Sequence, residues 1–254
     1  MSTIQPCELH GADGKLIRGD RAEGKDRQIL FINGFLSKRW GNKSKALAQW
    51  CQEQGWGFCC YDVRGFGESE GTFTDYTLSD WITDARAVLE LIKSGPPITT
   101  VGNSLGGWIA WLMAQEFQEI ERLILIAPAF NMMGLRAQSI SAERCHEWHR
   151  AGWMPWDDEP AHRDFPLAWK WVEESEAYWK TSFDRLRPVS TAILHGQQDS
   201  VILPLGSSQF VERLRSLAPS LPVELHLVPG DHRLSSPEHL DTFRRLVLDM
   251  RERR

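Results

Sequence analysis

The sequence contains no apolar stretch that approaches the roughly 20 residues a membrane-spanning helix requires. Its first residues, MSTIQPCELHGADG, have neither the apolar core of a signal peptide nor the Arg-rich pattern of a transit peptide. The five cysteines are odd in number and follow neither a disulfide nor a metal spacing, which favours a reducing compartment. We therefore expect a cytoplasmic protein without a membrane span.

An excess of positive charge is also lacking. The formal net charge is −5, and the one short basic cluster is residues 251–254 at the end of the chain. This balance argues against nucleic-acid binding, which depends on neutralising phosphates. With 254 residues, the chain is long enough for one large α/β domain or two small ones with a substantial core.

Apolar runs and amphipathic segments alternate along most of the chain. The runs typical of buried strands are QILFI, WGFCCYDVRGFG (a strand with a Gly-rich exit), PITTV, RLILIAPA, TAILHG and VELHLV. Helical spacing is found between or after them, in residues 43–54, 78–93, 108–117, 206–218 and 237–252. This alternation predicts a mainly parallel, twisted sheet with helices on both faces. Residues 7–18, around the turn at Gly14, predict a hairpin that adds antiparallel strands at one edge.

Residues 129–185 break the alternation. Two helices are expected there, over 142–151 and 167–181, and a long insertion after a central strand is typical of a lid. We therefore predict a core domain of residues 1–128 and 186–254 with a short helical lid of residues 129–185. The tryptophans of this segment either pack it onto the core or line a ligand cavity. The candidates for substrate contact are Trp153, Trp156 and Trp179.

Two serines fit the pattern G-x-S-x-G, but their contexts differ. Ser104 in GNSLGG follows an apolar strand and precedes a helix, the sharp turn that exposes a nucleophilic hydroxyl. Ser69 in GESEG lies between two carboxylates and leads into a polar, turn-like stretch, where an alkoxide would be disfavoured. We therefore predict Ser104 as the nucleophile and Ser69 as part of a loop.

A nucleophilic serine needs a base and a group that orients the base. Asp199 follows the strand TAILHG, and His232 follows the next strand, VELHLV. Both therefore lie on the same rim of the sheet as Ser104, in the chain order Ser, Asp, His. Other histidines fit less well: His195 and His226 read as packed strand residues.

The predicted oxyanion hole consists of two backbone N–H groups. One belongs to Leu105, directly after the nucleophile, and the other to Phe35 in the loop NGFL after the first buried strand. The alternative for Asn33-Gly34 is a plain turn. A helical C-H-x-x-H pattern at residues 145–149 is the one candidate for a metal site, but no fourth ligand completes it, so no metal is expected.

The segments FINGF, YDVRGFGES, GNSLGG, HGQQDSVILP and GDHRLS together resemble the α/β-hydrolase superfamily. Within it, the chain is most similar to the acyl-glucuronide esterase and palmitoyl-protein thioesterase branch and its bacterial relatives, through SLGGW, WVEESEAYW and the HR pair. The resemblance implies cleavage of an ester or thioester through an acyl-enzyme on Ser104, Asp199 and His232, without metal or organic cofactor. Asn33 departs from the histidine that many members have at this position.

The expected partner is a small or medium acyl ester or thioester, handled by a monomer or a homodimer. Arg233, next to His232, either binds an anionic leaving group or forms a structural salt bridge. A peptidase, a C–C hydrolase or an acyltransferase would use the same triad, and a non-catalytic binding protein on this scaffold is a further alternative.

Overall fold

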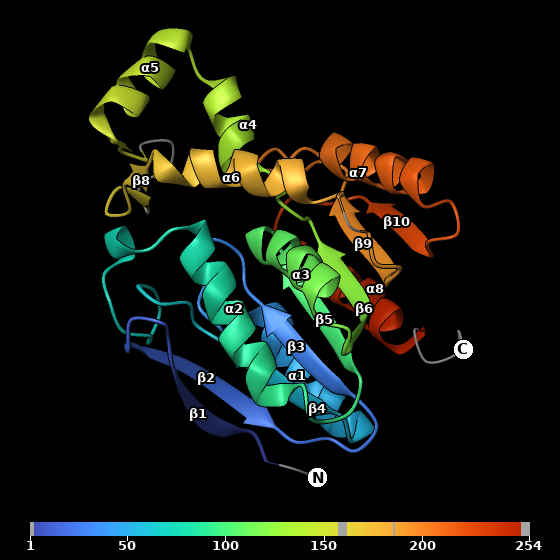
Figure 1. Cartoon of the computed structure of the whole chain (residues 1–254). Helices are drawn as coiled ribbons and strands as arrows, with labels where there is room; N and C mark the ends of the chain where they lie inside the picture. The colour runs from blue at the N-terminus through green and yellow to red at the C-terminus, as the bar shows by residue number, and fades with distance from the viewer. Residues whose placement is uncertain (1–2, 157–161, 185, 250–254) are drawn as a thin grey trace.

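The computed structural model describes residues 3–156, 162–184 and 186–249. Within them, eight strands form one sheet in the order β1-β2-β4-β3-β5-β6-β9-β10 (Figure 1). Its strands are β1 (Gln5–His10), β2 (Leu16–Ala22), β3 (Gln28–Ile32), β4 (Gly57–Tyr61), β5 (Ile98–Asn103), β6 (Ile120–Ile126), β9 (Ser190–Gly196) and β10 (Val223–Val228). The strands from β4 to β10 pair in parallel, whereas β1 and β2 are antiparallel at one edge. The predicted mainly parallel sheet with an edge hairpin is thus confirmed.

Helices cover both faces of the sheet, as the alternating pattern predicts. Helices α1 (Asn42–Gln54) and α8 (Pro237–Asp249) pack on one face (Figure 1). Helices α2 (Leu78–Ile92), α3 (Leu105–Glu116) and α7 (Pro204–Leu217) pack on the other. The strands β3 and β4 are buried along their whole length, because side chains of both faces meet helices.

Between β6 and β9 the chain crosses the carboxyl ends of the parallel strands (Figure 1). This part contains α4 (Met132–Ser139), α5 (Ala142–Ala151), the short strands β7 (Trp153–Met154) and β8 (Leu167–Ala168), and α6 (Lys170–Thr181). A single helical turn, η1 (Phe73–Asp75), precedes α2. Two details differ from the expectation. Helix α6 begins at Lys170 rather than at Leu167, because residues 167–168 pair with β7, and α4 lacks a clear signal in the sequence.

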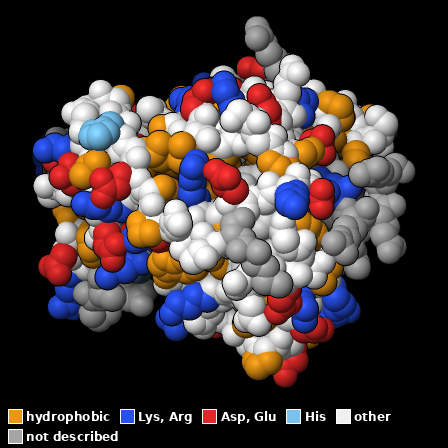
Figure 2. All heavy atoms as spheres, turned by 90° about the horizontal axis from the view of Figure 1, so that it is seen from below, with side chains coloured by type: hydrophobic (Ala, Val, Ile, Leu, Met, Phe, Trp, Pro, Cys, Tyr) orange, Lys and Arg blue, Asp and Glu red, His pale blue; other side chains and the backbone are white. Residues whose placement is uncertain are grey.

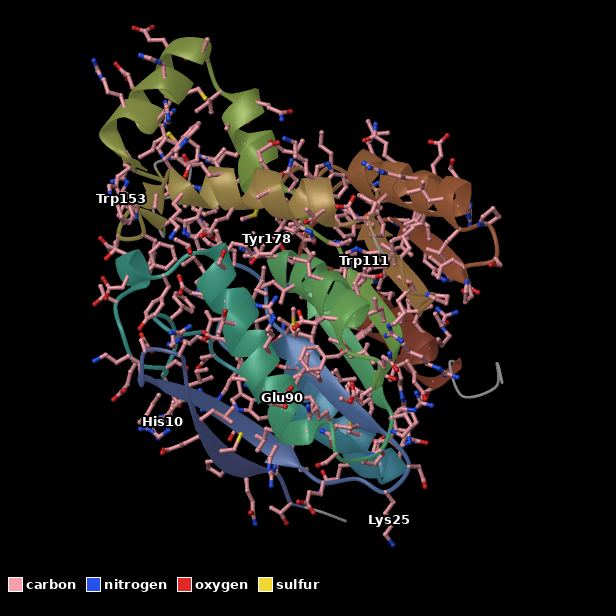
Figure 3. All side chains as sticks on the ribbon, in the orientation of Figure 1. His10, Lys25, Glu90, Trp111, Trp153 and Tyr178 are labelled. Atoms are coloured by element: carbon pink, nitrogen blue, oxygen red, sulfur yellow. The ribbon has the colours of Figure 1, made fainter. Side chains whose placement is uncertain are left out.

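Helix α6 is tied to the core through α2. The carboxylate of Glu174 accepts hydrogen bonds from the Thr77 hydroxyl at 3.0 Å and from the Ser79 N–H at 2.8 Å. These groups form the first turn of α2, where a negative charge is favourable. Tyr178 points from α6 toward the core (Figure 3), and its hydroxyl lies 3.4 Å from Ser79 Oγ. The crossing segment is therefore anchored at the end of α2.

The face of the molecule opposite the crossing segment carries a mixed surface. Acidic and basic side chains are interspersed there with apolar ones (Figure 2), in keeping with the small net charge. None of the described helices combines the length and the apolar character that crossing a membrane would take.

Candidate active site

Ser104 lies at the sharp turn between β5 and α3. Its φ angle is 53°, in the region that L-residues with a side chain seldom occupy. The glycines on either side make this turn possible. A Cβ atom on Gly102 would lie 2.3 Å from the Gly106 carbonyl oxygen, and one on Gly106 would lie 2.2 Å from the Ile32 carbonyl oxygen. The turn therefore requires small residues two positions before and two after the serine, as its motif predicts.

A chain of hydrogen bonds joins Ser104 to His232 and Asp199. His232 Nε2 lies 3.1 Å from Ser104 Oγ, although the two residues are 128 positions apart in the sequence. On the other side of the ring, His232 Nδ1 lies 2.7 Å from Asp199 Oδ2. The structure thus brings together three side chains from the loops after β5, β9 and β10. An imidazole in this position can take a proton from the serine hydroxyl while the carboxylate holds the ring.

Asp199 is buried and fully engaged. Its Oδ1 accepts hydrogen bonds from the backbone N–H groups of Val201 at 2.9 Å and Ile202 at 2.8 Å. Burial by itself would raise the pKa of the Asp199 carboxyl, but hydrogen bonds from two histidines and from the Ile202 N–H hold the pKa well below its ordinary value of 3.8. Asp199 is therefore a carboxylate at neutral pH.

The second histidine at Asp199 is His195, which the sequence assigns only to the packed core. Its side chain is indeed completely buried, but Nε2 lies 3.1 Å from Asp199 Oδ2. The signal available in the sequence is the spacing of HGQQD, which places both residues around the end of one strand. His226, in contrast, pairs with Glu224 on the outer strand β10.

The loop after β3 lies directly against the serine. A Cβ atom on Gly34 would lie 3.1 Å from Ser104 Cβ, so the backbone that leads into Phe35 closely approaches the nucleophile. The N–H groups of Phe35 and Leu105 donate no hydrogen bond within the described part of the chain. Leu105 is also the first residue of α3, where backbone N–H groups favour negative charge. Neither of the two predicted donors is therefore occupied by a described residue.

Ser69, the other serine in a G-x-S-x-G pattern, has quite different contacts. Its hydroxyl donates to the Asp62 carbonyl oxygen at 2.6 Å and accepts from the Arg18 N–H at 2.9 Å. It thereby links the loop after β4 to β2. This geometry fits the interpretation of Ser69 as a loop residue.

The three candidate tryptophans lie in different surroundings. Trp156 stacks on Phe35, with ring centroids 5.1 Å apart. Trp179, on α6, packs edge-on against Phe183 at 5.1 Å. Trp153 is 42% exposed, points away from the core (Figure 3), and lines a surface hollow of about 450 Å³ beside α5. Of the three, Trp156 is the one that contacts the predicted oxyanion loop.

Arg233 is exposed on the loop after β10, and its guanidinium forms no ion pair with a described residue. Its carbonyl oxygen accepts a hydrogen bond from Lys43 Nζ at the start of α1. The structural salt bridge considered for Arg233 is therefore absent among the described residues. Residues 145–149 lie on α5, and no described cluster of histidine, cysteine and acidic residues could hold a metal ion.

A sequence profile of the family described as serine aminopeptidase, S33, matches residues 24–178, more than half of the chain. The chain belongs to this hydrolase family. The matched part includes the turn at Ser104 but ends before Asp199 and His232.

Known relatives agree with this assignment. The mouse mitochondrial palmitoyl-protein thioesterase ABHD10 is 28% identical over 216 residues, which cover 84% of this chain and 71% of the mouse protein. The rat protein of the same name is 27% identical over the same length.

Solved structures show the fold. Mouse α/β hydrolase domain-containing protein 10 superimposes with a TM-score of 0.86 at 24% identity, over 97% of this chain and 98% of the other. A putative hydrolase from Agrobacterium vitis also gives a TM-score of 0.86, at 25% identity, over 99% and 100% of the two chains. The protein is therefore an α/β hydrolase, as the resemblance implies.

Proposed function

We propose that this hydrolase cleaves carboxylic esters or thioesters of small to medium acyl substrates, with Ser104 as nucleophile. The observation that carries the proposal is the hydrogen-bond chain from Ser104 Oγ through His232 to Asp199. The similarity to the mouse palmitoyl-protein thioesterase supports an acyl substrate.

In the first half of the reaction, His232 Nε2 takes the proton from Ser104 as the hydroxyl oxygen attacks the substrate carbonyl carbon. The carbonyl oxygen becomes negatively charged and accepts hydrogen bonds from the N–H groups of Phe35 and Leu105. When the tetrahedral intermediate collapses, His232 passes its proton to the departing alcohol or thiol. The acyl group remains bound to Ser104 as an ester.

In the second half, water replaces the leaving group. His232 Nε2 takes a proton from this water as its oxygen attacks the acyl-enzyme, and the same proton then returns to Ser104 Oγ as the acid is released. Asp199 stays ionised throughout and stabilises the imidazolium that forms in each half. Every proton transfer in this scheme uses a side chain of the protein itself.

The substrate groups on either side of the scissile bond meet different surroundings. We assign the aromatic side formed by Phe35 and Trp156 to the apolar acyl or aryl part, with residues 129–185 acting as a lid. We assign an anionic leaving group to the guanidinium of Arg233, which is exposed and forms no ion pair with a described residue. Trp179, whose ring centroid lies 6.2 Å from that of Phe130, is assigned to a more distant acyl contact, whereas the exposed Trp153 contributes only if the substrate extends to the hollow beside α5.

The test is hydrolysis of p-nitrophenyl esters of graded chain length by the wild type and by Ser104→Ala. We expect the substitution to lower kcat by about a thousandfold or more. Ser69→Ala is the matched control, because it removes a hydroxyl from the same sequence pattern. Equal turnover by the wild type and Ser104→Ala would refute the proposal.

Peptidase activity is the second candidate, because the family profile carries the description serine aminopeptidase. The same attack on an aminoacyl amide would require His232 to protonate an amine. Rates on matched ester, thioester and aminoacyl-amide substrates separate the two candidates. An amide rate comparable with the ester rate would favour the peptidase.

A further inference from the structure

His195 occupies the end of β9, where every polar atom of its ring has a partner. The side chain is completely buried. Nδ1 lies 2.8 Å from Ser207 Oγ on α7, and Ser207 is itself 1% exposed. Nε2 lies 2.9 Å from the Ile202 carbonyl oxygen and 3.1 Å from Asp199 Oδ2. A buried ring with such contacts on both sides cannot rotate without losing several hydrogen bonds.

The partners of Nε2 decide where a ring hydrogen lies. The Ile202 carbonyl oxygen and the Asp199 carboxylate can only accept hydrogen bonds. Nε2 of His195 must therefore carry a hydrogen, which it shares between these two acceptors. Ser207 Oγ meets the other nitrogen and keeps the ring in this orientation.

This N–H completes the set of donors around one carboxylate. The Val201 and Ile202 amides donate to Asp199 Oδ1, while His232 and His195 both contact Oδ2. The hydrogen bond from His195 to the Ile202 carbonyl oxygen also connects the end of the loop that carries Asp199 to β9. A free carboxylate could turn about its terminal bond, whereas this one is held by donors on both oxygens.

We propose that His195 is a positioning residue that holds Asp199 with Oδ2 toward Nδ1 of His232. The effect on turnover rests on the proposed function, in which His232 is the base. The effect on the geometry and charge at Asp199 does not, because it follows from the contacts alone.

The direction of the pH effect follows from the groups around this pair. Among the described residues, Asp199 contacts His195 directly, and His232 contacts the same carboxylate oxygen. Asp231 lies on the His232 loop and faces Lys43 of α1, and Ser207 of α7 is uncharged. Removing the His195 donor leaves more of the negative charge on Oδ2 to stabilise a protonated His232. The acid limb of kcat/KM should then move to higher pH.

The experiment compares two substitutions at this position. His195→Leu removes the donor and fills its buried space with an apolar side chain. In His195→Gln, the side-chain amide can still donate a hydrogen bond from near the position of Nε2. We expect His195→Leu to lower kcat about tenfold or more with little change in KM, the scale for losing a hydrogen bond to a charged group. We expect His195→Gln to recover most of this loss. The His232 ring titration, followed by NMR, should move to higher pH in His195→Leu only.

The NMR titration needs no turnover, so it separates the two proposals. A shifted His232 titration in a protein whose Ser104→Ala variant is as active as the wild type would overturn the proposed function and support the positioning role. An unchanged titration and pH profile in folded His195→Leu would overturn the positioning role, even if the melting temperature falls. Equal loss of kcat in His195→Gln and His195→Leu would also overturn it.

If His195→Leu does not fold, Ser207→Ala tests the same proposal. It removes the partner of Nδ1, so that only the two contacts of Nε2 hold the ring. We expect the same upward movement of the acid limb, smaller in size. Wild-type pH dependence in folded Ser207→Ala would overturn the proposal.

Discussion

Two loops of this molecule share the pattern G-x-S-x-G, but the hydroxyl groups of their serines have different kinds of hydrogen-bond partner. Ser104 sits at a φ angle of 53°, with its hydroxyl 3.1 Å from an imidazole nitrogen. Ser69 donates to and accepts from backbone groups, so its hydroxyl closes a loop. The pattern alone supplies a tight turn. What distinguishes Ser104 is the imidazole of His232 beside its hydroxyl.

The glycines of the two loops teach the same lesson. Gly106 is required because the backbone of β3 passes close to it, at the point where the predicted oxyanion loop begins. Gly71 is required because its φ angle is 97° and the Tyr76 ring lies against it. In the first loop the close approach brings the backbone after β3 against the turn at Ser104, whereas in the second it packs a turn against Tyr76.

The largest expected effect concerns the base. His232→Gln should lower kcat on a p-nitrophenyl ester by about a thousandfold or more, because no group remains to take the Ser104 proton. The rate of reaction with a fluorophosphonate probe should fall with it. His226→Gln on β10 is the control and should keep both rates within about twofold. Undiminished labelling of the His232 variant would remove the distinction between the two serines.

A smaller but still large effect is expected from Gly106→Ala. The added methyl group would lie 2.2 Å from a backbone oxygen, so we expect a loss of about 3 kcal/mol or more in the free energy of unfolding, together with loss of activity. Urea denaturation measures the first and ester hydrolysis the second.

Gly206→Ala provides the control for that substitution. A Cβ atom there meets nothing within 4 Å, and the residue lies in α7. We expect a gain of up to about 1 kcal/mol and unchanged activity. A folded and fully active Gly106→Ala protein would show that the turn at Ser104 tolerates a side chain.

The hydroxyl of Ser104, unlike that of Ser69, is linked through His232 to the carboxylate of Asp199, whose charge makes the stability of the protein depend on pH. Because its folded pKa lies below 3.8, the ionised carboxylate contributes stability that is complete above the unfolded pKa and is lost as the pH falls through the folded one. Asp199→Asn should therefore be less stable than the wild type by about 1–3 kcal/mol at pH 7. The difference should narrow as the pH falls below about 4. The free energies of unfolding of the two proteins are measured by urea denaturation across this pH range. A difference that stays constant would contradict the assignment.

The smallest effect concerns Ser69. Ser69→Ala removes two hydrogen bonds of a buried hydroxyl, so we expect a loss of about 1–2 kcal/mol in the free energy of unfolding with kcat unchanged. Ser104→Ala should give the reverse pattern, with activity lost and stability nearly unchanged. A drop in kcat for Ser69→Ala beyond the loss of folded protein would mean that this loop also supports the site.

Much of the fold could be predicted because local patterns and tertiary packing agree. The apolar runs of β3 to β10 and the amphipathic spacing of α1 and α2 each signal their own structure. Helix α4 could not be predicted in the same way, since its composition is mixed and it forms through packing against α6. The start of α6 depends on the pairing of residues 167–168 with β7, a contact with no local signal.

The sequence by itself determined the alternation of strands and helices, the strained turn at Ser104, and the positions of Asp199 and His232 at the ends of their strands. These features depend on residue type and local spacing, which the chain carries directly. Only the tertiary structure decided which side chains meet. It decided that the Ser69 hydroxyl bonds to backbone groups, that Trp156 stacks on Phe35, and that His195 turns its Nε2 toward Asp199. Such contacts join residues that are distant in the chain or that depend on the rotation of a single ring, so packing alone selects them.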